Sequence, residues 1–358
     1  MRVKFPPLRT AKIHVDPVTT YTGNMTSNND MQSDAGNAMN LAARRTPDAI
    51  SPKAVAETMD RVLNAAETVI LGKNPQLRLA LACLMARGHL LIEDQPGMGK
   101  TTLAHVLARV MGLEFQRIQF TSDLLPADII GASIYERDTG SFTFHPGPVF
   151  AQLVLADEVN RATPKCQSAL LEAMEEQQVT VEGRTYPLPQ PFFVIATQNP
   201  VHQIGTFPLP ESQLDRFLMR LTMGYPDKQA ERDLLAGRDR RELVADLMPA
   251  LDPDELQAMQ AQVSRVRVAD ALLDYLQALL DFSRQSNEFS VGLSPRGGLA
   301  LLHAAQAWAL LHSRNHVLPE DVQMVLPAVA GHRLQGRGEA SGLGPETLAA
   351  RLLEVPIP

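Results

Sequence analysis

Cysteine is scarce in this 358-residue chain, which holds only Cys83 and Cys166. Two cysteines so far apart form no disulfide framework and no zinc-binding spacing, which indicates a reducing compartment. Long apolar runs are missing as well, since none approaches the ~18 residues that span a membrane. The N-terminal residues lack the pattern of a signal peptide. We therefore expect a cytoplasmic protein with no membrane span.

Positive charge is not in excess either. The net charge is −7, whereas general nucleic-acid binders usually carry a basic face, so we expect nucleic acid to be an unlikely partner. The nine histidines show no metal-ligand spacing. Hydrophobic residues make up 45% of the chain, which is ordinary for a globular protein with room for two or three domains.

The pattern along the chain predicts four parts. Residues 1–50 are polar and aperiodic, which predicts a disordered extension. Residues 51–225 alternate strand-like and helix-like segments and predict a parallel sheet with helices on both faces. Residues 226–335 have only helical periodicity and predict a small all-helical domain. Residues 336–358 are predicted to form a C-terminal tail.

The expected elements can be placed approximately. The strands are expected at 89–93, 115–120, 152–156, 192–197 and 217–222. Inserts at 131–146 and 178–188 alternate polar and apolar residues around turn residues, which predicts two hairpins. The later helices are expected at 227–236, 254–263, 268–284, 295–312 and 319–332.

A glycine-rich turn follows the first expected strand and precedes a helix-like segment. It contains Pro96, Gly97, Met98, Gly99, Lys100, Thr101 and Thr102. This arrangement wraps backbone N–H groups around nucleotide phosphates and directs the lysine toward them. The first glycine of the full pattern is replaced by Asp94; because aspartate tolerates left-handed backbone, we still expect the turn to form.

An acidic pair ends the apolar strand at 152–156. Asp157 would be suited to hold Mg²⁺ together with the Thr101 hydroxyl. Glu158 would be suited to activate a water for attack on the terminal phosphate of ATP. An isolated Asp-Glu more often caps a helix. Downstream of a phosphate-binding loop, the catalytic interpretation is favoured.

Three further residues are candidates with plainer alternatives. Asn199 follows a buried strand and could orient the attacking water, although asparagine before proline also suits a simple turn. Arg216 precedes the last strand, and Arg296 follows Ser294 and Pro295 at a predicted helix start. Arginine suits a transferring phosphate, but either arginine taken alone could form a surface ion pair.

Taken together, these motifs resemble those of the MoxR family of AAA+ ATPases. They are PGMGKTT at 96–102, LADEVNRA at 155–162, ATQNP at 196–200, LDRF at 214–217 and SPR at 294–296, with support from 169–176 and 207–213. The resemblance covers about residues 52–332. It implies a P-loop AAA+ fold, in which an α/β parallel sheet is followed by a helical lid.

The resemblance also implies roles for single residues. The loop from Gly97 to Thr102 corresponds to Walker A, and Asp157 with Glu158 to Walker B. Asn199 corresponds to sensor 1, Arg216 to an arginine finger acting on the neighbouring subunit, and Arg296 to sensor 2 acting on nucleotide of its own chain. The stretch from Val69 to Gly72, with Ile70, resembles the segment that packs near the adenine.

The implied function is ATP hydrolysis with Mg²⁺ in a ring of six subunits. Relatives act like chaperones, maturing partner proteins or inserting metal cofactors, often with a protein that carries a von Willebrand factor A domain; the client protein is not encoded in this chain. Three alternatives remain: the ATPase subunit of a metal chelatase, a nucleic-acid motor, and a nucleotide-sensing scaffold. The acidic charge disfavours the motor, and the presence of Glu158 and Arg216 disfavours the scaffold.

Overall fold

A computed structural model describes residues 50–138, 140–199, 206–237 and 239–357. The extension expected at 1–50 lies outside the described residues, apart from Ile50. The first helix is α1 (Pro52–Glu67), at the start of the part predicted to alternate strands and helices. Ser51 caps it by accepting a hydrogen bond from the N–H of Ala54 at 3.2 Å, and Pro52 occupies the first helical position.

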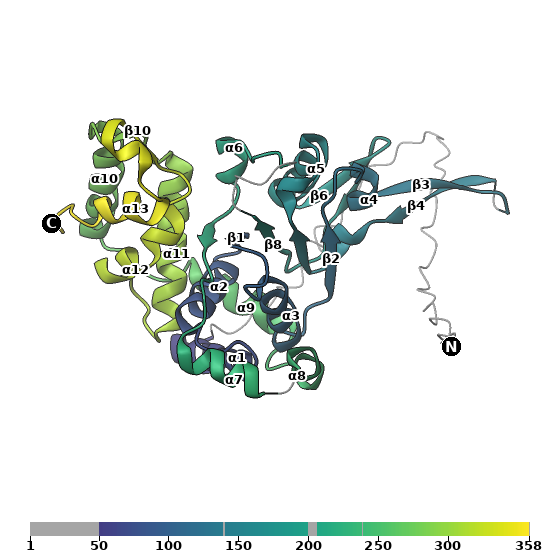
Figure 1. Ribbon diagram of the computed structural model, residues 1–358, viewed down its shortest axis with the longest axis horizontal. Coiled ribbons are helices and arrows are strands. Elements are labelled where there is room, and N and C mark those ends of the chain that lie inside the picture. The colour runs from purple at the N-terminus through teal and green to yellow at the C-terminus, as the bar shows by residue number, and fades with distance from the viewer. Residues whose placement is uncertain (1–49, 139, 200–205, 238, 358) are drawn as a thin grey trace, which may run out of the picture. The chain divides into compact units, whose positions relative to one another are not determined.

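A five-stranded parallel sheet forms the centre of the fold (Figure 1). Its strands lie in the order β2-β5-β8-β1-β9, so the first strand in sequence sits between the last two. All four strand pairs are parallel. The bounds are β1 (Leu90–Glu93), β2 (Phe115–Gln119), β5 (Leu153–Asp157), β8 (Phe193–Gln198) and β9 (Met219–Leu221). The predicted α/β class and all five strands are confirmed.

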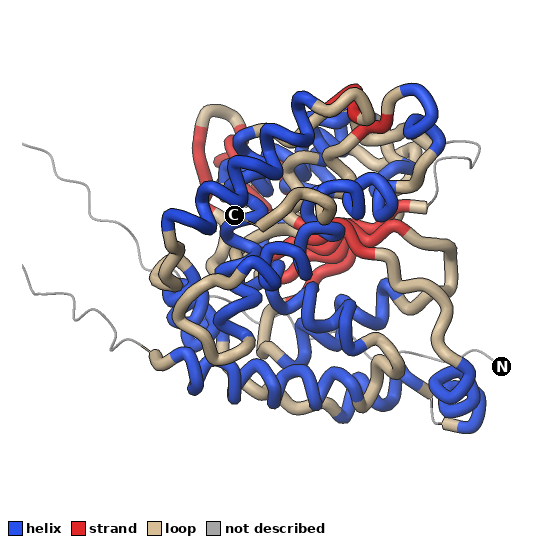
Figure 2. The backbone as a smooth tube through the Cα atoms, turned by 90° about the vertical axis from the view of Figure 1, so that its left-hand side faces the viewer, coloured by secondary structure: helices blue, strands red, loops and turns tan. Residues whose placement is uncertain are grey.

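Helices cover both faces of this sheet, which explains why its inner strands β1, β5 and β8 are mostly apolar (Figure 2). The edge strand β2 alternates with polar residues and is largely exposed. Leu90 and Ile92 of β1 join the core on one face, and Leu91 between them joins the core on the other. The first face is covered by α1, α2 (Asn74–Met85) and α3 (Lys100–Val110), and the second by α4 (Pro126–Ile130) and α5 (Pro164–Glu176). Motif residues at the strand ends are thereby held between two packed layers.

Two antiparallel hairpins interrupt the sheet and confirm the predicted inserts. The first, β3 (Gly131–Glu136) with β4 (Ser141–Pro146), projects from the sheet (Figure 1). The second is β6 (Gln178–Val181) with β7 (Arg184–Pro187). Phe144 of the first stacks on Tyr186 of the second with ring centroids 4.1 Å apart. Short helical turns complete this part: η1 (Pro148–Phe150), η2 (Val159–Arg161) and α6 (Glu211–Leu214).

The predicted helices after the sheet are present, with additions. They are α7 (Lys228–Ala236), α9 (Pro253–Val263), α10 (Asp270–Gln285), α11 (Pro295–Leu311) and α12 (Pro319–Ala330). Helix α8 (Arg240–Asp246) and the short pair β10 (Phe289–Val291) with β11 (Gln335–Gly336) are present in addition to the predicted elements. Helices α9 and α11 pack on α2, so packing continues across the expected boundary at 225.

The segment expected to be a tail, 336–358, belongs to the helical domain. It contains η3 (Gly338–Gly342) and α13 (Pro345–Leu352). Helix α13 packs against α12 and buries Leu348, Ala349 and Leu352. The apolar spacing of a single eight-residue helix is too short a signal to distinguish it from a tail.

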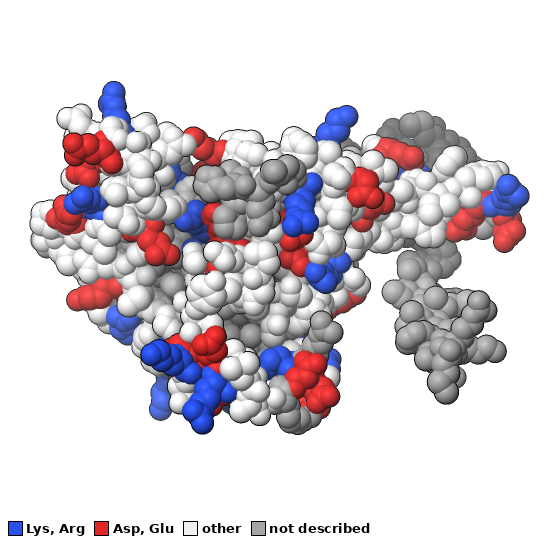
Figure 3. Space-filling view, viewed as in Figure 1, with Lys and Arg blue, Asp and Glu red and all other residues white. Residues whose placement is uncertain are grey.

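The surface mixes charges of both signs. On the face shown in Figure 3, basic and acidic side chains are interspersed, and neither sign forms a continuous patch. Among the helices of the described residues, none is both long and apolar enough to cross a membrane.

Candidate active site

The glycine-rich loop links the end of β1 to the start of α3, as predicted. Gly97 (φ 86°) and Gly99 (φ 81°) have left-handed backbone, and a Cβ atom on either would meet nothing within 4 Å. Backbone conformation therefore requires these glycines, and the space beside them is open. Because α3 begins at Lys100, the open space lies at a helix N-terminus, which favours an anion such as phosphate.

Asp94 replaces the usual first glycine without left-handed backbone, since it is not among the residues with positive φ. Its carboxylate instead accepts a hydrogen bond from the N–H of Gly224 at 2.7 Å and one from the N–H of Gln95 at 2.8 Å. Gly224 lies in the connection between β9 and α7. The aspartate thus ties the phosphate-binding loop to a segment far away in sequence.

The loop and this connection line one cavity of about 540 Å³, a usual size for a small-molecule site. The predicted residues Ile70, Pro96, Gly97, Met98, Gly99 and Thr102 line it, together with Val69, Leu71, Lys73, Met223, Gly224, Tyr225, Pro226, Glu231, Leu234, Leu235 and Arg240. Lys100 and Thr101 are not among the lining residues, and neither is Gly72. Gly72 lies beneath the start of α7, where an added Cβ would come 3.0 Å from the Cβ of Ala230.

Asp94→Gly restores the usual loop pattern but removes the tie to Gly224. We expect ATP affinity to fall about tenfold to a hundredfold, because losing a hydrogen bond to a charged group costs about 1.5 to 3 kcal/mol. Asp94→Asn is the matched control, since its side-chain oxygen can still accept from Gly224. Calorimetric titration with a non-hydrolysable ATP analogue measures both. Unchanged affinity in Asp94→Gly would show that the hydrogen bond between Asp94 and Gly224 does not contribute to ATP binding.

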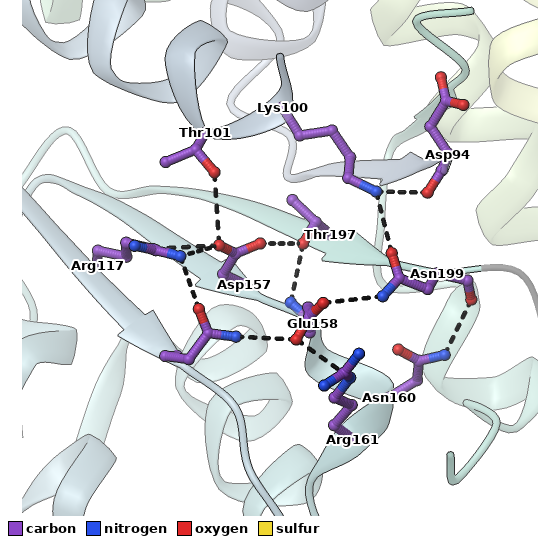
Figure 4. Close-up of polar contacts among 11 residues, drawn as sticks. Asp94, Lys100, Thr101, Arg117, Asp157, Glu158, Asn160, Arg161, Thr197 and Asn199 are labelled. Carbon is purple, nitrogen blue, oxygen red and sulfur yellow. Dashed lines mark hydrogen bonds and ion pairs between the residues drawn. The ribbon is translucent and has the colours of Figure 1, made fainter. Parts of the chain in front are cut away.

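Lys100 and Asn199 meet beside the loop (Figure 4). The Lys100 ammonium donates to the Asp94 carbonyl at 2.5 Å, the Gln95 carbonyl at 3.3 Å and the Asn199 Oδ1 at 3.3 Å. Burial lowers the pKa of Lys100, and the nearby carboxylates, Asp94 first among them, oppose that shift. The Asn199 side chain thus contacts Lys100, which a residue that only formed a turn before Pro200 would not need to do.

Asp157, at the end of β5, is buried and faces Thr101. Thr197 donates to its Oδ1 at 2.6 Å, and the Thr101 hydroxyl lies 3.5 Å from its Oδ2. A hydroxyl and a carboxylate oxygen side by side fit Mg²⁺, which takes few protein ligands when phosphates and water supply the rest. Arg117 of β2 also reaches Oδ2, with its Nη2 at 2.5 Å and its Nε at 3.1 Å.

Glu158 adopts left-handed backbone (φ 57°, ψ 47°), a strained state for a residue with a Cβ that is common at functional sites. Its N–H donates to the Thr197 hydroxyl at 2.8 Å. Its carboxylate accepts hydrogen bonds from Asn199 Nδ2 at 2.9 Å and Gln119 Nε2 at 3.1 Å and pairs with Arg161 at 3.1 Å. Asn199 therefore bridges Lys100 and Glu158, and the loop, acidic pair and asparagine form one network.

Arg216 and Arg296 meet elsewhere, on a shared carboxylate. Arg216 Nε lies 2.8 Å from Glu175 Oε2, and Arg296 Nη1 lies 3.2 Å from Glu175 Oε1. The cavity that all three line shares no lining residue with the cavity at the phosphate-binding loop. Arg296 thus pairs with Glu175 in this structure, and its expected approach to nucleotide of its own chain stays a prediction. Its helix, α11, starts beside Arg216.

The sheet order, the phosphate-binding loop after β1, the acidic pair after β5 and the helical lid define a P-loop ATPase of the AAA+ class. Two family models match the chain. One describes the ATPase family associated with various cellular activities (AAA) and matches residues 89–219; the other describes the AAA lid domain and matches 281–352. The second match includes α13, in agreement with its packing in the lid.

Curated relatives and a solved structure narrow the class. The chain is 46% identical to the uncharacterized protein YeaC of Bacillus subtilis, over 80% of this chain and 90% of that one. It is 38% identical to Chaperone MoxR1 of Mycobacterium tuberculosis, over 84% of this chain and 82% of that one. A crystal structure of a candidate ATPase from Cytophaga hutchinsonii covers 85% of this chain and 96% of its own, with a TM-score of 0.77 and 34% identity. The chain belongs to the MoxR family of AAA+ ATPases and hydrolyses ATP.

Proposed function

We propose that this protein is a ring-forming ATPase that remodels other proteins, and that each active site is completed by the neighbouring subunit. One observation carries the proposal. Arg216 and Arg296 share Glu175 in a cavity separate from the one at the phosphate-binding loop. Two arginines held away from their own nucleotide site suit a role at the site of a neighbour.

Within one subunit, the network supplies the remaining chemistry. Thr101 and Asp157 would hold Mg²⁺, which neutralises charge on the phosphates when bound. Glu158 would accept a proton from the attacking water, and Asn199 fixes the orientation of its carboxylate. Lys100 lies at the helix start with its ammonium on carbonyl oxygens that phosphate oxygens would replace.

Assembly would supply the arginines. A head-to-tail interface, in which one surface of a subunit meets a different surface of the next, closes into a ring. Six subunits are proposed from the family resemblance. In such a ring, Arg216 and Arg296 would leave Glu175 for the more highly charged phosphates of the neighbour's ATP.

The remodelling role is supported by the relative named Chaperone MoxR1. The β3–β4 hairpin is not part of the sheet and carries two exposed aromatic side chains, Tyr135 and Phe142, which offer contacts to another protein. A partner with a von Willebrand factor A domain and a role in metal-cofactor insertion are proposals from the family resemblance alone.

The nucleic-acid motor is the weaker alternative. The mixed charges in Figure 3 and the net charge of −7 offer no extended basic surface on the face shown. The metal-chelatase alternative shares the same ATP chemistry and would differ only in the client.

Dilution tests the shared active site. We expect ATPase activity per subunit to fall as the protein is diluted, in parallel with dissociation of the assembly followed by sedimentation in ATP. Chelating magnesium should abolish activity at every concentration. Constant activity per subunit down to concentrations at which only single subunits sediment would contradict the proposal.

A further inference from the structure

Arg333 follows α12 in the lid and contacts the backbone that carries Arg216. Its side chain is only 4% exposed. Its Nη2 donates to the carbonyls of Asp215 at 3.2 Å and Phe217 at 2.7 Å, and its Nη1 donates to the carbonyl of Leu218 at 3.2 Å. One guanidinium therefore binds main-chain oxygens on both sides of Arg216 in sequence.

The same guanidinium also forms an ion pair with Asp215, through its Nε at 2.6 Å from Asp215 Oδ1. The other carboxylate oxygen of Asp215 accepts a hydrogen bond from the Ser294 hydroxyl at 3.4 Å. Ser294 is the N-cap of α11, two residues before Arg296, and accepts from the N–H of Gly297. Asp215 thus connects the segment of Arg216 to the helix start that carries Arg296.

The two arginine head groups meet on Glu175, as described above. Their main chains are tied by Asp215 and Arg333, and their guanidinium groups by one carboxylate. Arg333 lines the same cavity as Glu175, but among the described residues it forms no hydrogen bond or ion pair with that carboxylate. It does not line the cavity at the phosphate-binding loop. A guanidinium buried this deeply is retained only where its donors are satisfied. Three of its acceptors are the carbonyls around Arg216, and the others are the Asp215 carboxylate, the Val329 carbonyl and the His332 ring nitrogen.

We propose that Arg333, with Asp215, is a positioning residue that holds Arg216 and Arg296 as one unit for the ATP of the neighbouring subunit. This inference rests on the proposed function, because it assumes that both arginines act between subunits. Under this proposal, Arg333 of the lid affects ATP hydrolysis at the active site of the neighbouring subunit. A residue that only stabilised its own subunit would have no such effect.

The test uses Arg333→Met and, as a variant that keeps the side-chain shape, Asp215→Asn. We expect each to bind an ATP analogue with affinity within about twofold of the wild type, because neither residue lines the ATP cavity. We expect kcat to fall at least about tenfold, since a displacement of about 1 Å can cost as much as 10²-fold in rate. The double variant Arg216→Ala/Arg333→Met should be no slower than Arg216→Ala alone.

Mixed assemblies separate positioning from simple stability. Subunits with Lys100→Ala lack a working nucleotide site but keep both arginines and Arg333. Added to Arg333→Met, they should restore activity above that of either alone, because they offer correctly held arginines to intact sites. Arg314→Met is the matched control, since it breaks another ion pair of the lid, with Asp321, and should leave kcat unchanged.

The results of these mixtures test the role of Arg333 and the action of Arg216 between subunits separately. If Arg216→Ala is restored by Lys100→Ala subunits but Arg333→Met is not, Arg333 serves its own subunit and the inference fails while the proposed function stands. If neither is restored, action between subunits fails. Wild-type kcat in Arg333→Met also overturns the inference. If Arg333→Met does not fold, Asp215→Asn decides by the same criteria.

Discussion

Glu158→Gln should keep ATP bound and slow its hydrolysis about 10² to 10⁴-fold, the usual contribution of a general base. Glutamine has the same shape and can still accept the hydrogen bond from Asn199 Nδ2. It cannot take a proton from water. The lysine, glycines and Thr101 are untouched, so binding of the triphosphate should persist.

Single-turnover hydrolysis and nucleotide binding, measured on the same preparation, check this expectation. Lys100→Ala is the control that should lose both binding and turnover, because it removes the cation at the start of α3. Near-normal hydrolysis in Glu158→Gln would remove Glu158 from its catalytic role. A parallel loss of binding would instead place the effect in the geometry of the site.

The same variant should identify the client. We expect the ATP-bound form to be the one that binds the protein partner. Because Glu158→Gln does not turn over, client proteins should co-purify with it in ATP. They should not co-purify with Lys100→Ala. This comparison separates a remodelling ATPase from a metal chelatase by the nature of the retained protein.

The sheet and most of the site could be predicted from the sequence because the signals are local. The strand ending in Asp157 is apolar from Leu153 to Ala156, which indicates burial on both faces, and parallel strands bring their carboxyl ends to one edge. The loop from Gly97 to Thr101 is continuous in sequence. The site therefore follows from three short segments, which are the loop, the acidic pair and the stretch ending in Asn199, and from the topology of an open sheet.

The remainder depends on pairs that no local pattern encodes. Asp94 and Gly224 are 130 residues apart, and Arg333 and Asp215 are 118 apart. Burial of Arg333 cannot be inferred from its neighbours in sequence, because arginine is ordinarily exposed. Glu175 carries no motif that marks it as the partner of two arginines. The strands β10 and β11 are too short for alternation to be detected.

Arg216→Ala should reduce ATP turnover by about 10³ to 10⁵-fold, the range measured for arginine fingers in related phosphoryl transfer. The Arg216 guanidinium is 28% exposed and pairs with Glu175, and a partly exposed ion pair contributes little to stability. Arg216 does not line the cavity at the phosphate-binding loop. The variant should therefore fold and bind ATP normally.

Mixing Arg216→Ala with Lys100→Ala subunits gives the decisive measurement. An Arg216→Ala subunit keeps an intact nucleotide site, and a Lys100→Ala neighbour offers it an intact Arg216. With equal amounts in a ring of random order, about a quarter of all sites combine both and should turn over normally. Activity should rise from nearly zero for each variant alone to about that fraction of the wild-type value.

A chain that carries both substitutions is the matched control for this mixture. Mixed with Arg216→Ala, it adds neither a working site nor an arginine, so activity should stay at the background. Arginine acting within its own chain predicts no recovery in either mixture, because no single subunit then holds a complete set of groups. Recovery in the first mixture alone requires that Arg216 cross a subunit boundary, which is the arrangement that its place on Glu175, away from the phosphate-binding loop, predicts.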